Sequence, residues 1–417
     1  MKARPRQPEP FIRGAPYPPT EEVPYPRADP TDVRRLPADV WHAACVPVGV
    51  RLEMVGDAEA VDVAYRTTTG NLGYRGDGAG VTFSVWRAGR HVCEADAELG
   101  DGLVRLRLAP NTPHRPATIY LPEGMLPVVR SLTAVHGEIA PAPPGPRWLA
   151  YGDSITQGWV ASGPAQAWPS IAARKAGLDL MNMGYAQSGR GDIPSAEQMA
   201  ALEADVITIS YGASSWTRVP HSTAMIWAGL HGFLDVVRQG HPETPVIVMS
   251  PVLQSETDDE SNRLGASLTD IRGAIESVTR SRIKEGDDNL ALLEGAGVIG
   301  ERHLGDGMYP GDEGHKRIAA GVGKYLLAAL RGSLRDLATA ERDHPTEHDD
   351  GSDRAVDPDD DEEGEEPGRG SDDSSDDERA PMRVVDDHGD AVPPRPRAGR
   401  PVSDRPLYRR SARAPAV

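Results

Sequence analysis

Cysteine and long apolar runs are scarce in this chain. Only Cys45 and Cys93 occur among 417 residues, too few for a disulfide framework or a cysteine-rich zinc site, and such scarcity is typical of a reducing compartment. No stretch of about 18 apolar residues is present, which argues against a transmembrane helix. The first residues, MKARPRQPEPFIRG, are basic but lead into no apolar segment. We therefore expect no secretory signal and a cytoplasmic protein.

The net charge of −18 comes mainly from one segment. Residues 341–380 hold nineteen Asp and Glu against four Arg, and residues 381–417 hold eight Arg against four Asp. The rest of the chain is only mildly acidic and shows no basic stripe, so we expect no nucleic-acid partner. Residues 341–417 have too little apolar content to fold alone. They are predicted to form a disordered tail, first acidic and then rich in Arg and Pro, whose acidic part could bind a protein partner.

Composition divides the remaining chain into three parts. Residues 1–38 contain ten prolines and are predicted to form an extended arm, either free or packed over the next domain. Residues 39–140 contain short alternating or β-branched runs, such as AVDVAYRT and GVTFSVWRAG, separated by Gly, Asp, Asn and Pro. This spacing predicts a β-sandwich domain.

Residues 141–340 change to apolar runs that alternate with helical segments. The five runs are RWLAYG, LDLMNMG, DVITISYG, PVIVMSP and NLALLEG. The alternation predicts an α/β domain with a five-stranded parallel sheet and helices on both faces. Because ligands bind at the carboxyl ends of such strands, the informative residues should follow each run.

One motif follows the first of these runs and carries candidate chemistry. It reads YGDSITQGW over residues 151–159 and places Ser154 on a turn between a strand and a helix. Gly152 and Gly158 permit a tight turn, and the following backbone amides can donate to a developing oxyanion. The motif therefore predicts that Ser154 is an exposed nucleophile.

Around this motif the chain resembles the SGNH (GDSL) hydrolase family over roughly residues 145–335. The resemblance implies a flavodoxin-like sheet and activity as an esterase, a lipase, an acetyl-xylan-type deacetylase or an acyltransferase. With a sandwich in front, the chain also resembles GDSL acyltransferases of actinobacterial polyketide tailoring. A small-molecule ester or acyl substrate is implied.

Two further family blocks are altered in this sequence. Where the family usually has Asn-x-Gly-x-x-Gly, residues 182–187 read NMGYAQ, so Gln187 stands at the glycine that provides an oxyanion amide. That amide can still donate if Gln187 tolerates the required φ. Where the family usually has Gly-x-Asn-Asp, residues 212–215 read GASS, and the shorter Ser214 replaces the oxyanion asparagine. We expect Asp153, Gln187 and Ser214 on the oxyanion or substrate-binding side of the site.

The last family block, Asp-x-x-His-Pro, fits residues 306–315 in two registers. Asp306-x-x-Tyr309-Pro310 keeps the proline but has tyrosine at the histidine position, whereas Asp312-x-x-His315 keeps the histidine without the proline. Asp312 before a helical run is explained as an N-cap, which favours the first register. Tyrosine, with a pKa near 10, is poorly suited to deprotonate a serine at neutral pH. His315, or less favourably His303, would then have to serve as the base.

Three functions are compatible with these residues. In a serine esterase or acyltransferase, Ser154 attacks an ester or acyl carbonyl, His315 takes the proton and Asp306 orients it. In a repurposed SGNH fold, the pocket binds a ligand or catalyses a non-hydrolytic reaction with Tyr309 as a hydrogen-bond donor. In a binding or scaffold protein, the sandwich would bind carbohydrate or another domain. No metal or other cofactor is expected, because no His or Cys partners have suitable spacing and no phosphate-loop pattern occurs.

Overall fold

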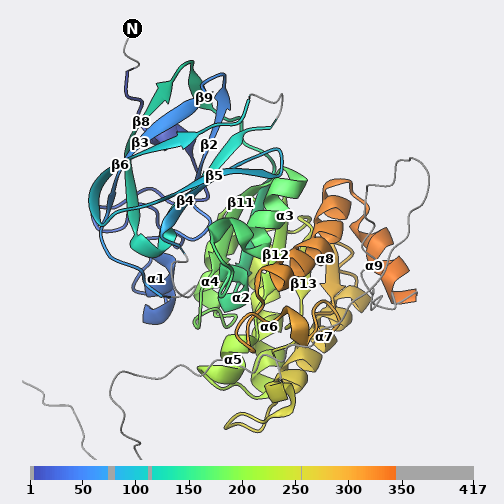
Figure 1. Ribbon diagram of the computed structural model, residues 1–417. Helices are drawn as coiled ribbons and strands as arrows, with labels where there is room; N and C mark the ends of the chain where they lie inside the picture. The colour runs from blue at the N-terminus through green and yellow to red at the C-terminus, as the bar shows by residue number, and fades with distance from the viewer. Residues whose placement is uncertain (1–3, 74–79, 111–114, 255, 344–417) are drawn as a thin grey trace, which may run out of the picture. The chain divides into compact units, whose positions relative to one another are not determined.

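The computed structural model describes residues 4–73, 80–110, 115–254 and 256–343. These residues form antiparallel sheets followed by a parallel sheet with helices on both faces (Figure 1). The predicted order, a β-sandwich before a flavodoxin-like α/β domain, is confirmed. The tail predicted for residues 341–417 lies outside the described residues from residue 344 onward. In the part that is described, no helix combines the length and apolar character needed to cross a bilayer.

The sandwich consists of two antiparallel sheets. The first has the order β1-β2-β7-β4-β5, with β9 paired to β2, and the second has the order β6-β3-β8. Their bounds are β1 Ile12–Arg13, β2 Arg51–Gly56, β3 Ala60–Thr67, β4 Thr82–Arg87, β5 Arg90–Asp96, β6 Gly100–Arg107, β7 Ala117–Tyr120, β8 Pro127–Val135 and β9 Ile139–Pro141. Apolar residues alternate along β3, and Val61, Val63 and Tyr65 are buried between the sheets. The alternating apolar residues of the run AVDVAYRT therefore point into the sandwich core, because successive side chains of a strand face opposite sides.

The proline-rich segment packs against the sandwich. Arg6 exchanges backbone hydrogen bonds with Leu132, and β1 pairs with β2. Phe11 and Tyr25 are buried in the sandwich core, and the Tyr25 hydroxyl accepts a hydrogen bond from the Val129 amide at 3.0 Å. Of the two arrangements open to an extended arm, the described residues therefore adopt the packed one.

Arg27, in the same segment, connects the arm to the α/β domain. Its guanidinium is fully buried and donates from Nη1 to the carbonyls of Asn182 and Gly184, at 2.8 and 2.7 Å. Its Nε donates to the Val46 carbonyl at 2.6 Å, and the group lies 5.1 Å from the Tyr185 ring centroid. Helix α1 (Ala38–Ala44) follows and contributes buried side chains to the α/β core. The arm thus supports the end of strand β11.

The α/β domain is built on a parallel sheet with strand order β11-β10-β12-β13-β14. The strands are β10 Arg147–Gly152, β11 Asp179–Gly184, β12 Val206–Ser210, β13 Val246–Met249 and β14 Leu290–Leu293. In β10, Leu149 and Tyr151 pack on one side and Trp148 and Ala150 on the other, so the run is apolar throughout. Because the order reverses at β10, the turn after this strand lies where α/β sheets bind ligands.

Helices cover both faces of this sheet (Figure 1). One face carries α4 (Ile193–Ala201), α6 (Thr223–Gly240) and α7 (Leu268–Lys284). The other carries α3 (Trp168–Ala176) and α8 (Asp312–Leu330), followed by α9 (Leu334–Asp343). Three of the helices begin at side-chain caps, namely Asp192, Ser222 and Ser267. Each cap accepts an otherwise unpaired amide of the first turn, which explains where the helix starts.

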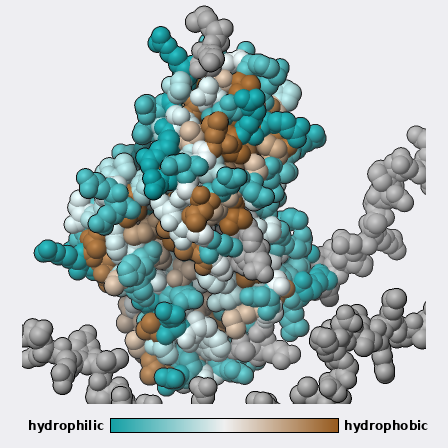
Figure 2. Space-filling view, turned by 60° about the vertical axis from the view of Figure 1, so that its left-hand side comes forward, coloured by the Kyte–Doolittle hydropathy of each residue, from teal (hydrophilic) through white to brown (hydrophobic). Residues whose placement is uncertain are grey.

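Apolar side chains on the surface are scattered rather than gathered. Figure 2 shows brown apolar residues dispersed among polar ones on one face. The most exposed large apolar side chains lie on separate elements, for example Leu103 on β6 and Trp227 on α6. Isolated exposed apolar residues are normal in soluble folds, so none of these positions marks a binding surface by itself.

Candidate active site

Ser154 begins the short helix α2 (Ser154–Gln157) directly after β10. The turn is tight because a Cβ on Gly152 would lie 2.1 Å from the Ser210 carbonyl oxygen. Helix α2 ends at Gly158, whose φ of +96° is in the region that favours glycine. Ser154 is 3% exposed. The strand and the two glycines therefore hold its hydroxyl at the carboxyl end of the sheet.

Asp153 joins this turn to the loop after β12. Its Oδ1 accepts the Ile155 amide at 3.1 Å, and its Oδ2 accepts the amides of Gly212 and Ala213 at 3.2 and 3.1 Å. Burial raises the pKa of this carboxyl to about 6, although the amides that bond to it lower the value. Since both oxygens bond to backbone, the side chain holds two loops together.

The raised pKa of Asp153 makes stability depend on pH. An acid with a higher pKa in the folded than in the unfolded state binds more protons when folded, between the two values. The free energy of unfolding should therefore fall as pH rises from about 4 to 6, by about 3 kcal/mol from this group. In Asp153→Asn this loss should be absent, so the unfolding free energy of wild type minus that of the variant, measured in urea, should decrease by about 3 kcal/mol over this pH range.

The exposed change Asp101→Asn on β6 is the matched control, and its unfolding curve should follow that of the wild-type protein. The Asp153→Asn substitution also replaces an acceptor oxygen, which lowers stability equally at every pH. Parallel pH profiles for wild type and Asp153→Asn would rule out a raised pKa at this position.

Gln187 lies in the loop after β11 and has a φ of +62°. Its backbone amide donates to Ser154 Oγ at 3.2 Å. Neighbouring backbone groups fix the loop, because Gln157 Oε1 accepts the Ala186 amide at 2.9 Å and a Cβ on Gly189 would meet the Gly152 carbonyl at 2.0 Å. Gln187 thus adopts the left-handed conformation that the family glycine would provide, and its amide faces the serine.

Ser214 belongs to helix α5 (Ala213–Thr217), which Gly212 precedes with a φ of +146°. Its side chain is 2% exposed. Within the described residues, Ser214 Oγ is buried without a hydrogen-bond partner. Unpaired buried hydroxyls are uncommon because burial without a hydrogen bond costs free energy. The hydroxyl is therefore available to a ligand group at this edge of the sheet.

Tyr309 lies in the loop before α8, and its side chain approaches Ser154. Its hydroxyl lies near the Ser154 side chain, which acts on the pKa of the phenol. The pKa of Tyr309 is raised because the phenol is partly buried and lies near the negative charges of Asp153 and Asp306, and these causes outweigh the opposing effect of Ser154. A phenol with a raised pKa donates a proton in a hydrogen bond but is a poor base.

Asp306 shapes the loop that carries Tyr309. Its Oδ1 accepts the amides of Met308 and Tyr309 at 3.0 and 2.7 Å, and the loop is closed by a bridge between Leu304 and Pro310. The ring of Trp159 lies 6.2 Å from that of Tyr309. The carboxylate therefore bonds to the backbone of the position where the family has histidine.

His315 lies in the first turn of α8 and is fully buried. Its Nδ1 accepts the Trp168 amide at 3.3 Å, so the proton is on Nε2, which lies 3.2 Å from the Trp159 carbonyl oxygen. Both nitrogens thus bond to backbone. His303 is also bonded locally, because its Nδ1 accepts the Gly300 amide at 2.9 Å.

The expectation that Asp312 caps α8 is wrong. Gly311 occupies the N-cap, and its carbonyl accepts the His315 amide at 2.9 Å. Asp312 instead accepts from the amide and hydroxyl of Ser162, at 2.8 and 2.6 Å. The loop that contains Ser162 offers two donors that the sequence pattern does not reveal. The Asp312 carboxylate therefore fixes this loop to α8.

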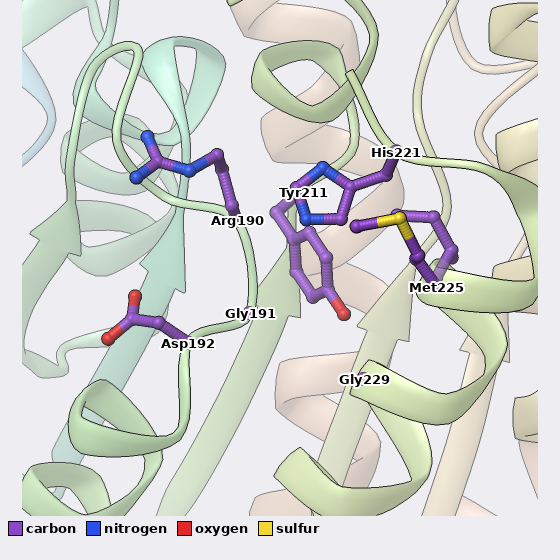
Figure 3. Close-up of a pocket in the computed structure, with 8 residues that line it drawn as sticks. Arg190, Gly191, Asp192, Tyr211, His221, Met225 and Gly229 are labelled. Carbon is purple, nitrogen blue, oxygen red and sulfur yellow. The ribbon is translucent and has the colours of Figure 1, made fainter. Parts of the chain in front are cut away.

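A small cavity beside the Gln187 loop was not anticipated from the sequence. It has a volume of about 140 Å³. Figure 3 shows Arg190 and Asp192 on one side of it and Tyr211, His221 and Met225 on the other. Arg190 and Asp192 follow β11, and Tyr211 follows β12. Their position after a strand is the only feature of the sequence that pointed to them.

The fold and the serine turn are similar to those of SGNH hydrolases and acyltransferases, and comparison with known proteins supports this similarity. Residues 147–326 match the model of the GDSL-like Lipase/Acylhydrolase family. The sequence matches none of the curated proteins.

Solved structures resemble both parts of the chain. A salicylyl-acyltransferase, SsfX3, from a tetracycline biosynthetic pathway is 23% identical with a TM-score of 0.68, covering 80% of this chain and 98% of its own. A putative GDSL-like lipase from Bacteroides ovatus is 20% identical with a TM-score of 0.65, covering 79% and 98%. An acetyl xylan esterase, Est2A, from Butyrivibrio proteoclasticus is 13% identical with a TM-score of 0.51, covering 79% and 99%. At these identities the likeness establishes the fold of the sandwich and the α/β domain together.

Proposed function

We propose that the site around Ser154 binds the acyl or ester group of a small molecule and lacks the base for efficient turnover through a serine acyl-enzyme. One observation carries the proposal, namely that the phenol of Tyr309 lies near the Ser154 side chain. A phenol thus occupies the place that the family gives to an imidazole. Among the described residues, the two candidate bases, His303 and His315, bond to backbone amides instead.

The polar groups around Ser154 support binding of a carbonyl oxygen. The Gln187 amide, the unpaired Ser214 hydroxyl and the Tyr309 hydroxyl are polar groups on three different segments of the chain. Donors of this kind hold a carbonyl or carboxylate oxygen in the ground state as well as in a transition state. The ligand class is therefore an ester, an acyl donor or the corresponding acid.

Serine acyl chemistry is the second candidate, favoured by the Gln187 amide next to Ser154 Oγ. In that case Ser154 attacks the carbonyl, the proton passes to His315 after a rearrangement, and Asp306 orients the base. Hydrolysis and acyl transfer would differ only in whether water or another nucleophile attacks the acyl-enzyme.

The two functions are separated by labelling and binding measured together. We expect the wild-type protein to form no adduct with a fluorophosphonate by intact mass and not to hydrolyse p-nitrophenyl esters above background. Methyl ketones of the same chain lengths should bind by ligand-detected NMR. Ser214→Ala and Tyr309→Phe should each weaken that binding about fivefold, as expected for one lost hydrogen bond.

Ser131→Ala, on β8 in the sandwich, is the control and should leave binding unchanged. An adduct and turnover that disappear in Ser154→Ala would instead establish the serine hydrolase or acyltransferase. Absence of both turnover and ketone binding would reject the binding function.

A further inference from the structure

A larger cavity lies where the sandwich meets the α/β domain, away from Ser154. Its volume is about 370 Å³, and it is lined by β2, β4, β7 and the end of α3. Gly145 and Gly177, which line it, precede strands β10 and β11, whereas Ser154 follows β10. A six-residue strand is about 20 Å long, so the two sites lie at opposite ends of the sheet.

Four arginines line this cavity, and one of them is neutralised. Arg51 Nε lies 2.7 Å from Glu53 Oε1, and its Nη2 lies 3.0 Å from Asp179 Oδ1. Its Nη1 also donates to the Leu180 carbonyl at 3.0 Å. The Arg51 guanidinium is therefore paired with two carboxylates, and its bonds to Asp179 and Leu180 connect the sandwich to the α/β domain.

Arg87 is buried in the same wall without a carboxylate partner. The residue is 4% exposed. Its Nη1 donates to the Ala109 carbonyl, and its Nε is buried with no hydrogen-bond partner within the described residues. Burial of a guanidinium is costly unless an anion or several acceptors compensate it. Arg87 thus adds a positive charge, without a carboxylate partner among the described residues, to the wall of the cavity.

Arg174 and Arg115 add two further positive charges. The Arg174 guanidinium lies 4.3 Å from the Trp86 ring centroid, and its Nη1 donates to the Tyr120 hydroxyl at 2.7 Å. Arg115 is exposed at the cavity. In the part of the chain that is described, neither forms an ion pair with a carboxylate. Stacking on Trp86 fixes the orientation of the Arg174 guanidinium. A guanidinium held in this way is suited to binding carboxylate and phosphate groups.

We propose that this arginine-lined cavity is a second ligand site, which binds a small-molecule oxyanion carrying phosphate or carboxylate groups. The three guanidinium groups of Arg87, Arg115 and Arg174 supply the charge. Glu53 is the one acid in the lining, and Arg51 already binds it. The volume is within the range of small-molecule sites. The site is independent of the chemistry at Ser154.

Calorimetric titration of the full chain at low ionic strength tests the proposal, with inorganic pyrophosphate and citrate as probes. We expect at least one of them to bind with a Kd of about 1 mM or lower. Arg115→Gln and Arg174→Gln should each weaken that binding about tenfold, the usual effect of one lost charged hydrogen bond. The probe that binds more tightly distinguishes a phosphate ligand from a carboxylate ligand.

Arg130→Gln, an exposed arginine on β8, is the matched control and should leave the affinity unchanged. Arg87→Gln tests the contribution of the buried charge, and the exposed Arg115 still gives a result if the Arg87 variant does not fold. No binding of either probe at about 10 mM would overturn the proposal. Equal weakening by Arg130→Gln would do so too, because it would indicate general charge attraction.

Discussion

Replacing Tyr309 with histidine is expected to give the protein esterase activity. The Tyr309 hydroxyl already lies near Ser154, so an imidazole on the same loop would lie beside the nucleophile. Asp306 accepts the backbone amide of this residue at 2.7 Å, which keeps a carboxylate close to the new ring. A positioned general base contributes about 10²- to 10⁴-fold to rate. Hydrolysis of p-nitrophenyl acetate by Tyr309→His should thus exceed wild type by at least about 10²-fold.

Two variants make this result specific. Tyr309→Phe removes the phenol without adding a base and should stay at the wild-type rate. Combining Tyr309→His with Ser154→Ala should remove both the activity and the fluorophosphonate adduct. If Tyr309→His folds but remains inactive, the loss of a base is not what limits this site.

Replacing Arg27 with methionine should have the largest effect on stability. The change leaves the carbonyls of Val46, Asn182 and Gly184 without the guanidinium that donates to them. A buried acceptor that loses its donor costs about 1–3 kcal/mol. Several acceptors are affected at once, so the free energy of unfolding should fall by about 3–5 kcal/mol. Urea denaturation followed by circular dichroism measures this directly.

Arg34→Met is the matched comparison because Arg34 is exposed in the same segment. It should change the free energy of unfolding by less than about 0.5 kcal/mol. Similar midpoints for the Arg27 and Arg34 variants would show that the arm does not support strand β11. Reduced ketone binding by Arg27→Met is also expected, since β11 leads directly into the Gln187 loop.

Much of the fold could be predicted because its signals are local. Each of the five apolar runs became a strand of the parallel sheet, and the run RWLAYG coincides with β10. The packing of the proline-rich segment could not be decided in the same way. It depends on Phe11, Tyr25 and Arg27 meeting surfaces far along the chain, and prolines specify an extended backbone without specifying its partner.

The candidate site could be predicted only in part, for a related reason. Ser154 was predicted from the motif after the first strand and Gln187 from the altered family block at residues 182–187, and the structure brings the Gln187 amide to Ser154 Oγ. Which of Tyr309 and His315 approaches Ser154 depends on how the loop of residues 304–310 closes and on the backbone groups that His315 meets. The arginine-lined cavity was missed altogether. Its residues come from four separate segments, and each arginine alone resembles an ordinary surface charge.

The arrangement around Ser154 also bears on how easily the site can change its chemistry. The oxyanion-side donor at Gln187 is a backbone amide, which survives replacement of the side chain as long as the left-handed conformation persists. The base position, in contrast, depends on the single side chain of Tyr309. Tyrosine and histidine codons differ only in their first nucleotide. Under the proposed function, one transition in the gene would therefore separate a pocket that binds a carbonyl from one equipped to cleave it.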